Sequence, residues 1–417
     1  MLAVNNDRFT GHDLKVRYAG LGRLEALRSP EGKRFAVCVR QAFDLIAIVL
    51  YIRQQGGSVL LLHASTPGGA AEAAARKADC ACLIYGGWDN AIPLQGGANY
   101  EPSILQYSSG TSREPALIAR SWRQVETEIE HYNRLFAGEA SCEPVVLVPV
   151  SHSFGLICGT LASMARGEEP LVVQDQNPKY ALQAIRSRPR SLVYAVPFLF
   201  SVMDAMARRE DRFHRMVVSG SPPTDPLLAR MKLRGDEVWQ QYGCTEAGCL
   251  SVARQPAAAT DVGRPLGHIA LSIVPDETSP AAPGSGEIVA VIGEQTIRTR
   301  DLGFIRPQDG RLHVIGRLDE LINVSGLKVV PSEVESVILR MPGVSEAVVL
   351  RTGHKVWGEA VRAIVVAEPS LGAKEIRAWC IRHLPAYKVP GVIDMAEEIP
   401  RTPAGKISRK YLQELER

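Results

Sequence analysis

Short apolar runs separated by helical segments set the strongest constraint on the fold of this chain. The run 58–62 is apolar after its first residue, and it lies between an apolar segment at 43–50 and an alanine-rich segment at 70–78. A second apolar run, 82–85, follows. Strands without hydrophobic–polar alternation are buried on both faces, and the intervening helices cover them. We therefore expect a βαβ rhythm and a parallel sheet with helices on both faces.

The alternation continues through most of the chain and then gives way to strands. A β-rich region at 263–293 is followed by a hairpin turn at Asp309 and Gly310. These features predict an α/β fold, with a large domain at 1–316 built of parallel-rich sheets flanked by helices plus a small β-rich subdomain. Its further expected strands are 105–107, 145–150, 171–173, 192–196, 216–221 and 238–242, and its further expected helices are 124–136, 180–187 and 198–209.

Polar and glycine-rich residues follow several of these strands, at the edge where parallel sheets bind ligands. The loop that starts at residue 108 offers hydroxyl and backbone N–H groups that can hold a phosphate chain, although an ordinary solvated loop has the same composition. Two later strands end in a histidine and in a run of small residues. The residues concerned are Ser108, Ser109, Gly110, Thr111, His152, Ser219, Gly220 and Ser221.

The segment 242–246, YGCTE, combines an aromatic residue, a glycine turn, a hydroxyl and a carboxylate. Thr245 can bond a phosphate oxygen, and Glu246 can hold Mg²⁺ through its oxygens. The alternative is a helix that begins here with Thr245 as its N-cap. Farther along, Asp301 is a lone carboxylate at a strand end, where it can bind both hydroxyls of a ribose or cap a turn.

A hinge-like segment at 316–335 divides the chain about three quarters of the way along. It reads GRLDELINVSGLKVVPSEVE and contains a strand, a turn at 325–326 and a second short strand. Ser332 and Glu335 then predict a capping box that opens a helix. From residue 317 to residue 417 the pattern predicts a mobile C-terminal α+β domain, of a size that commonly folds alone.

Composition excludes several classes of protein. The 417 residues suit two or three domains, and a net charge of +3 gives no reason to expect nucleic acid or a membrane surface as partner. The eight cysteines form no CxxC pair and the nine histidines no HxxxH pair, so a zinc site is not expected. The longest apolar stretch, 42–52, is too short to span a bilayer. We expect a cytoplasmic protein with reduced thiols, as a monomer or homodimer.

Four motifs, taken together, resemble the adenylate-forming superfamily of acyl- and aryl-CoA synthetases, peptide-synthetase adenylation domains and luciferases. The resemblance covers residues 35–410 and points to the branch of CoA and acyl-carrier ligases. The motifs are YGCTE at 242–246, RTRDLG at 298–303, the whole of 316–335, and RTPAGKISR at 401–409. Their order and spacing are more specific than any one of them.

The resemblance implies a role for each matching residue. Lys406, Thr245, Glu246 and His152 would be catalytic, with Glu246 holding Mg²⁺ and His152 near the carboxylate. Asp319 would be the hinge, and Gly326 with Lys328 would line the passage of the thiol arm. The residues implied to bind the nucleotide are Ser108, Ser109, Gly110, Thr111, Ser219, Gly220, Ser221, Tyr242, Gly243, Asp301 and Arg317.

The implied reaction uses ATP to turn a small carboxylic acid, aromatic or of short to medium chain, into an acyl-AMP with release of pyrophosphate. A thiol of CoA or of a carrier protein's phosphopantetheine then takes the acyl group. A rotation about Asp319 would exchange Lys406 for the Gly326 face between the two steps. The alternatives are a nucleotide or acyl-adenylate binding protein without turnover and, more remotely, an oxidative enzyme of the luciferase type.

The sequence departs from the family pattern in the phosphate loop, where Arg113 replaces a glycine and Ala116 a lysine. The region ahead of this loop is also shorter than is usual in the family. An arginine-rich segment could dock an acidic carrier protein or the phosphates of CoA, or form a solvated helix face. Its members are Arg186, Arg188, Arg190, Arg208, Arg209, Arg212 and Arg215.

Overall fold

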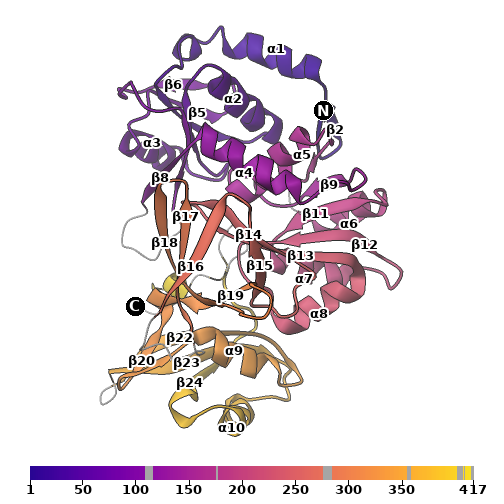
Figure 1. Ribbon diagram of the computed structural model, residues 1–417, viewed down its shortest axis with the longest axis vertical. Helices are drawn as coiled ribbons and strands as arrows, with labels where there is room; N and C mark the ends of the chain where they lie inside the picture. The colour runs from indigo at the N-terminus through magenta and orange to yellow at the C-terminus, as the bar shows by residue number, and fades with distance from the viewer. Residues whose placement is uncertain are drawn as a thin grey trace.

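A computed structural model describes residues 1–108, 116–174, 177–275, 284–354, 358–401, 407 and 409–414, with only the backbone at 410 and 414 (Figure 1). The N-terminal sheet lies at the top of Figure 1, the largest sheet in the middle and the C-terminal region at the bottom. Among the described residues, no helix is long and apolar enough to cross a membrane.

The N-terminal sheet has the order β6-β5-β3-β4-β7-β8 among the described residues. Its four inner strands are parallel, and the two edge strands are antiparallel to their neighbours. β3 connects to β4 through α2, and β4 to β5 through α3, as the βαβ rhythm predicts, whereas β5 leads to β7 by way of β6. The strands are β3 (Arg34–Val39), β4 (Ser58–Leu61), β5 (Cys82–Gly86), β6 (Ala91–Pro93), β7 (Ser103–Tyr107) and β8 (Leu117–Ser121), and the helices before and around them are α1 (Gly11–Leu21), η1 (Glu25–Leu27), α2 (Ala42–Gln54) and α3 (Gly68–Lys77).

The largest sheet has 13 strands among the described residues, and its central part is parallel. The N-terminal hairpin of β1 and β2 extends one edge of this sheet beside β10. The elements of this part are β1 (Leu2–Val4), β2 (Asp7–Phe9), α4 (Trp122–Arg134), β9 (Glu143–Val146), the π-helix η2 (Phe154–Leu161), α5 (Ala162–Ala165), β10 (Leu171–Val172), α6 (Pro178–Arg186), β11 (Ser191–Ala195), α7 (Pro197–Met206), β12 (Phe213–Val218), α8 (Asp225–Arg234) and β13 (Gly235–Cys244).

The β-rich region continues the largest sheet instead of forming a sheet of its own. β13 turns back into β14, and five further strands follow in antiparallel order. The hairpin turn expected at Asp309 and Gly310 joins two of them, with Gly310 at φ +66°. The strands are β14 (Gly248–Arg254), β15 (Asp261–Pro265), β16 (Ile269–Pro275), β17 (Gly286–Ile292), β18 (Gln295–Ile305) and β19 (Leu312–Arg317).

Three apolar cores hold these sheets in a layered stack. The main core combines side chains of both sheets with α2, α4 and η2 between them. α2 is buried on nearly every side, as a helix without a polar face must be. A second core lies under α6, α7 and α8 on the outer face of the large sheet, and a third under α3 on the outer face of the small one. The fold is the expected α/β arrangement with helices on both sheet faces.

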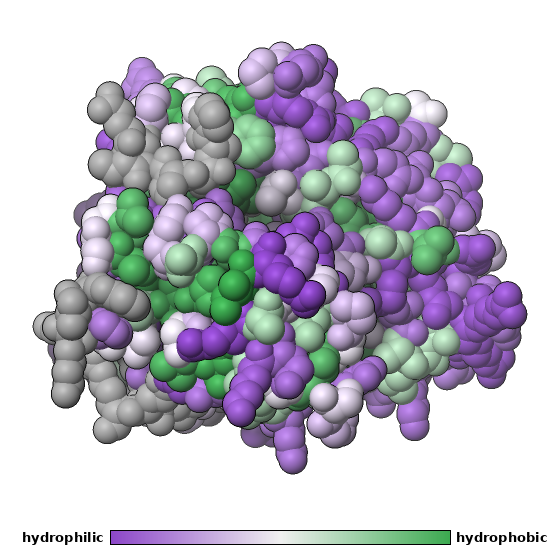
Figure 2. Space-filling model, turned by 90° about the horizontal axis from the view of Figure 1, so that it is seen from below, coloured by the Kyte–Doolittle hydropathy of each residue, from purple (hydrophilic) through white to green (hydrophobic). Residues whose placement is uncertain are grey.

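The C-terminal region has its own sheet and cores. Figure 2 looks at this end of the molecule, where hydrophobic side chains gather beside the grey segments and hydrophilic ones cover much of the rest. Its elements are η3 (Leu318–Glu320), β20 (Ile322–Val324), β21 (Leu327–Val329), α9 (Pro331–Leu339), β22 (Val344–His354), β23 (Gly358–Ala367), α10 (Ala373–His383), η4 (Ala386–Lys388), β24 (Val392–Met395) and α11 (Arg409–Glu414).

The capping box predicted at Ser332 and Glu335 is wrong. The N-cap position is Val330, two residues before Ser332, and no side chain caps α9, which begins at Pro331. The Ser332 hydroxyl instead donates to the carbonyl of Ile315, and the Glu335 carboxylate accepts a hydrogen bond from the Val349 N–H at 2.8 Å. Both side chains therefore connect α9 to other segments.

One member of the arginine-rich segment belongs to an internal ion pair, which corrects the docking interpretation for that residue. Arg215 is 4% exposed and pairs with Glu139 at 2.7 Å, so its guanidinium is not available to an acidic partner. Arg186 is exposed and donates two hydrogen bonds to Asp211, at 2.7 and 2.6 Å.

Candidate functional site

Asp301 is the centre of a small polar cluster between three strands. It lies in β18, opposite Arg317 at the end of β19. The Tyr242 hydroxyl, on β13, donates to Asp301 Oδ2 at 2.6 Å, and Arg317 Nη1 donates to Oδ1 at 3.0 Å. The Asp301 side chain is only 12% exposed. The sequence distributes these three residues over 76 positions; strand register pairs Asp301 with Arg317, and a side-chain hydrogen bond adds Tyr242 from a strand that is not their neighbour.

The electrostatics of Asp301 combine burial with neighbouring charges. Burial raises the pKa of the Asp301 carboxyl, while the hydrogen bond from Tyr242 and the charge of Arg317 act to lower it. The negative charges of Asp319 and Glu246 raise it further. Burial also raises the pKa of the Tyr242 hydroxyl well above its usual range. An ionised Asp301 can therefore accept further hydrogen bonds, which a ligand can donate.

Arg317 bridges this cluster to Asp319, the residue expected to be the hinge. Its Nε and Nη2 donate to the two Asp319 oxygens at 3.0 and 3.3 Å. The Asp319 carbonyl accepts a hydrogen bond from Arg351 of β22, in the C-terminal region. The connection between β19 and β20 is thus hydrogen-bonded both to Arg317 of the Asp301 cluster and to Arg351 of the C-terminal region.

Thr245 and Glu246 lie in the turn between β13 and β14, where Cys244 pairs with Gly248. No helix begins there, so the alternative interpretation of Thr245 as an N-cap is wrong. Burial and then the negative charge of Glu246 raise the pKa of the Cys244 thiol to about 12, and Asp301 adds to the shift. Glu246 and Asp301 therefore lie near the same thiol, which gathers the turn and the Asp301 cluster in one region.

Oxygen ligands for a divalent cation are few here. No group of three or more histidine, cysteine, aspartate or glutamate side chains that could hold a metal occurs within the described ranges. Glu246 is half-buried. Mg²⁺ is commonly held by one or two carboxylates together with the phosphates of a nucleotide, so a single carboxylate in this position fits such an ion.

Ser219 directly follows the carboxyl end of β12, as expected, whereas His152 comes six residues after the end of β9. Ser219 is buried, whereas Gly220, with φ +92°, and Ser221 are exposed. The exposed His152 ring lies 6.4 Å from that of His63, centre to centre. Burial lowers the pKa of the His63 imidazole. Sequence reasoning missed His63, although it follows the carboxyl end of β4 and the same strand-end rule could have found it.

Two expected parts of the site lie outside the described residues. They are the loop residues Ser109, Gly110 and Thr111, and Lys406. The described base of the loop is closed by hydrogen bonds from the Ser108 N–H to the Ala116 carbonyl at 2.8 Å and from the Ala116 N–H to the Ser108 hydroxyl at 3.1 Å.

Gly326 and Lys328 belong to the β20–β21 hairpin of the C-terminal region. Ser325 at φ +52° and Gly326 at φ +89° form its turn, and the Gly326 N–H donates to Asn323 Oδ1 at 2.8 Å. A Cβ atom on Gly326 would meet no atom within 4 Å. The glycine is therefore needed for its backbone conformation, and its surroundings leave room for a ligand to approach.

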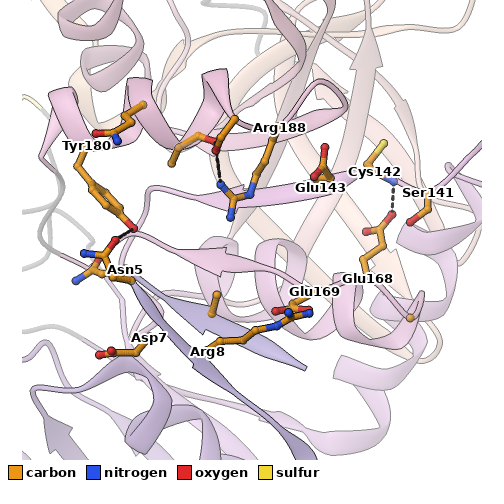
Figure 3. A pocket seen from close by; sticks show the side chains of 16 residues that line it. Asn5, Asp7, Arg8, Ser141, Cys142, Glu143, Glu168, Glu169, Tyr180 and Arg188 are labelled. Atoms are coloured by element: carbon orange, nitrogen blue, oxygen red, sulfur yellow. Dashed lines mark hydrogen bonds and ion pairs between the residues drawn. The ribbon is translucent and has the colours of Figure 1, made fainter.

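A polar cavity of about 630 Å³ lies elsewhere, between the β1–β2 hairpin, α6 and the segments that lead into β9 and β10 (Figure 3). Several of its charged groups have protein partners: Arg8 pairs with Glu169 at 2.6 Å, and the Glu168 carboxylate accepts a hydrogen bond from the Cys142 N–H at 3.0 Å. None of the described site residues lines it. The region around Asp301 and Glu246 is the candidate site.

Comparison with known proteins agrees with this choice. The model of the AMP-binding enzyme family matches residues 86–299, and that of the AMP-binding enzyme C-terminal domain matches residues 333–406. The chain is 41% identical over 416 residues to 3,4-dihydroxybenzoate–[aryl-carrier protein] ligase of Bacillus anthracis, across 99% of this chain and 98% of that ligase. It is 30% identical over 348 residues to 2-succinylbenzoate–CoA ligase of Geobacillus kaustophilus, across 76% of this chain and 69% of that ligase.

Solved structures share the fold over almost the whole chain. ATP-bound MatB from Rhodopseudomonas palustris superimposes with a TM-score of 0.87 at 17% identity, covering 99% of this chain and 95% of that one. The o-succinylbenzoate CoA synthetase MenE from Bacillus subtilis, in complex with its acyl-adenylate intermediate, gives 0.84 at 20% identity, covering 99% and 94%. At these identities the likeness concerns the fold.

Proposed function

Because the chain belongs to the adenylate-forming family of AMP-binding enzymes, and is thus an acid–thiol ligase that activates a carboxylic acid as acyl-AMP, we propose that its acid is aromatic and its acceptor a carrier protein. One observation carries this proposal: the 41% identity to the aryl-carrier ligase extends over 98% of that protein. The match to the CoA ligase is weaker and covers less of it. The aryl-carrier ligase, which matches this chain over nearly its whole length, therefore shares the short region ahead of the phosphate loop.

The Asp301 cluster supports binding of the nucleotide. The buried carboxylate would accept hydrogen bonds from the ribose hydroxyls, and Tyr242 and Arg317 hold it in place from two sides. Tyr242 would border the adenine together with Gly243 and the 219–221 segment. Ser108, the described part of the phosphate loop, directly follows β7, and the loop that starts there would hold the triphosphate.

In the first step, an oxygen of the substrate carboxylate attacks the α-phosphorus of ATP, the bond to the bridging oxygen breaks, and pyrophosphate leaves. Thr245 would donate a hydrogen bond to an α-phosphate oxygen, and the Lys406 ammonium would oppose the negative charge that gathers there. Glu246 would hold Mg²⁺, which when bound supplies charge neutralisation to the phosphates. His152, six residues after the end of β9, would face the carboxylate of the acid.

In the second step, the thiol sulfur attacks the acyl carbon, AMP leaves with the bonding electrons, and the thiol proton goes to solvent. We place the domain boundary between residues 316 and 317 and the rotation at Asp319. The turn at Gly326, with Lys328 beside it, would then admit the phosphopantetheine arm. The cytoplasmic location and the monomeric or dimeric state stay predictions.

Acid-dependent release of pyrophosphate tests this function. The panel should contain 3,4-dihydroxybenzoate, the two monohydroxybenzoates that lack one of its hydroxyls, benzoate and a medium-chain fatty acid. Each is measured alone, with CoA and with a phosphopantetheinylated aryl carrier protein. We expect release with an aromatic acid and thioester formation on the carrier. Release that no acid stimulates would instead favour a binding protein without turnover.

The affinity for ATP should depend on pH through Asp301. Burial holds the pKa of this carboxyl above its ordinary value, and the ribose hydroxyls donate to the ionised form. As the pH falls from about 8 to about 5, protonation should raise the KM for ATP at a higher pH than an exposed aspartate would. The KM for ATP from initial rates of pyrophosphate release checks this, and a flat KM over this range would contradict it.

A further inference from the structure

A buried ion pair lies directly behind the Thr245–Glu246 turn. Arg120 of β8 and Glu128 of α4 are 4% and 0% exposed, and the Arg120 guanidinium donates to Glu128 Oε2. Removing two charges from water costs free energy that their mutual attraction often fails to recover, so such a pair is weak evidence for a role in stability. Its surroundings indicate what else it does.

The second carboxylate oxygen of Glu128 binds the backbone of the β13–β14 hairpin, whose turn carries Thr245 and Glu246. Oε1 accepts a hydrogen bond from the N–H of Cys249 at 2.7 Å, three residues after Glu246. The preceding Gly248 has φ +75°, and a Cβ atom there would lie 2.3 Å from Glu128 Oε2. The hairpin backbone thus lies against the ion pair at the closest approach that glycine allows.

The same carboxylate reaches the other segments of the site. The Cys158 thiol, on the π-helix that follows His152, donates to Glu128 Oε1 at 3.7 Å. The Gln241 side-chain amide, one residue before Tyr242, donates to Cys158 Sγ at 3.3 Å. Arg120 itself lies on the strand that leaves the phosphate loop. One buried group therefore connects the hairpin, the π-helix and the strand after the loop.

We propose that Glu128, held by Arg120, is a positioning residue for the Thr245–Glu246 turn. It acts through the Cys249 N–H, which fixes where the turn places its hydroxyl and carboxylate towards the phosphates and the cation. This inference deepens the proposed function and rests on it. An error of about 1 Å in such a placement can reduce a rate by about 100-fold.

Two double variants separate positioning from stability. Arg120→Met/Glu128→Gln removes both charges and keeps a carbonyl oxygen that can accept from the Cys249 N–H. Arg120→Met/Glu128→Met removes both charges and the acceptor at similar volume. Each is compared by melting temperature, by kcat and half-saturating Mg²⁺ concentration in pyrophosphate release, and by hydrogen exchange of the 243–250 backbone without substrates.

We expect the methionine variant to melt lower than the glutamine variant, because it leaves the buried Cys249 N–H without an acceptor. The glutamine variant should keep kcat within about threefold, whereas the methionine variant should lose about 10- to 100-fold and need about tenfold more Mg²⁺, as for the loss of a group that orients a metal ligand. Exchange at the Cys249 amide should speed up in the methionine variant alone. Equal exchange and equal kcat in the two variants would overturn the proposal.

A matched control exists in the same domain. Arg166 and Glu168 form another buried pair, with side chains 9% and 4% exposed, and Glu168 also accepts from a cysteine N–H (Figure 3). Arg166→Met/Glu168→Met should lower the melting temperature without changing the Mg²⁺ requirement. A rise in that requirement equal to the one in the Glu128 variant would show a general loosening and would count against positioning.

Two further safeguards keep the test decisive. If the methionine variant does not fold, Glu128→Asp takes its place, because it keeps the charge for Arg120 but draws the carboxylate back from Cys249. Unchanged exchange at Cys249 in that variant would also overturn the proposal. If the unaltered protein shows no acid-dependent turnover, the proposed function fails, whereas the exchange comparison still decides whether Glu128 holds the hairpin.

Discussion

Lys406→Ala is expected to slow acyl-adenylate formation by on the order of 100- to 1,000-fold, the usual loss when one donor to a transition-state charge is removed. Thioester formation from supplied acyl-AMP should change little, because the proposed rotation would carry Lys406 out of the site before AMP departs from the acyl carbon. The two half-reactions are measured separately, as acid-dependent pyrophosphate release and as acyl transfer to the carrier protein.

The matched control for this variant is Lys374→Ala, an exposed lysine of α10 in the same region of the chain. It should leave both half-reactions at the level of the unaltered protein. A parallel loss of both half-reactions in Lys406→Ala would mean that the lysine serves the whole site, and it would remove the support for a rotation that exchanges Lys406 for Gly326.

Asp301→Asn is expected to lower kcat/KM for ATP by about 10- to 100-fold, since hydrogen bonds to a charged group contribute about 1.5–3 kcal/mol. The ribose hydroxyls would lose a charged acceptor, while kcat at saturating ATP should fall less. The variant should also lose the pH dependence of the KM described above. Initial rates with varied ATP at several pH values provide the measurement.

The same variant should not be less stable near neutral pH. Burial raises the pKa of Asp301 in the folded protein, so its contribution to stability is fully present below the unfolded pKa and is lost as the pH rises through the folded pKa. A neutral amide avoids that loss, and Arg317 keeps Asp319 as a partner. A melting temperature clearly below that of the unaltered protein above this window would contradict the electrostatic account.

The sequence predicted much of the fold, because apolar runs and helix periodicity are local properties. The βαβ order, the β-rich region and the C-terminal α+β region are all present. It was wrong at Ser332 and Glu335, where the local pattern of a capping box lost to contacts with Ile315 and Val349. Tertiary partners of polar side chains have no signature in a short window of sequence.

The candidate site, like the fold, was predicted in part from the sequence. Asp301, Tyr242 and Arg317 were predicted one at a time, through the resemblance, but the hydrogen bond of Tyr242 with Asp301 joins two strands that are not neighbours and lie 59 positions apart in the sequence. Glu128 was missed altogether. In the sequence it is one of several charged residues on α4, and only the packing of that helix against β14 shows that its side chain is fully buried.

The position of Arg317 at the end of β19 bears on which part of the molecule would retain the intermediate. Arg317 is the first residue beyond the proposed domain boundary, yet it pairs with Asp301 within the large sheet, and the proposed pivot, Asp319, comes two residues later. A rotation there would leave the ribose contacts unbroken. The mixed anhydride, which water would hydrolyse if it escaped, would then stay bound to the part of the protein that does not rotate. Only the groups that the C-terminal domain supplies around it would change. Leakage of acyl-AMP into solution should therefore be slow even when no thiol acceptor is present.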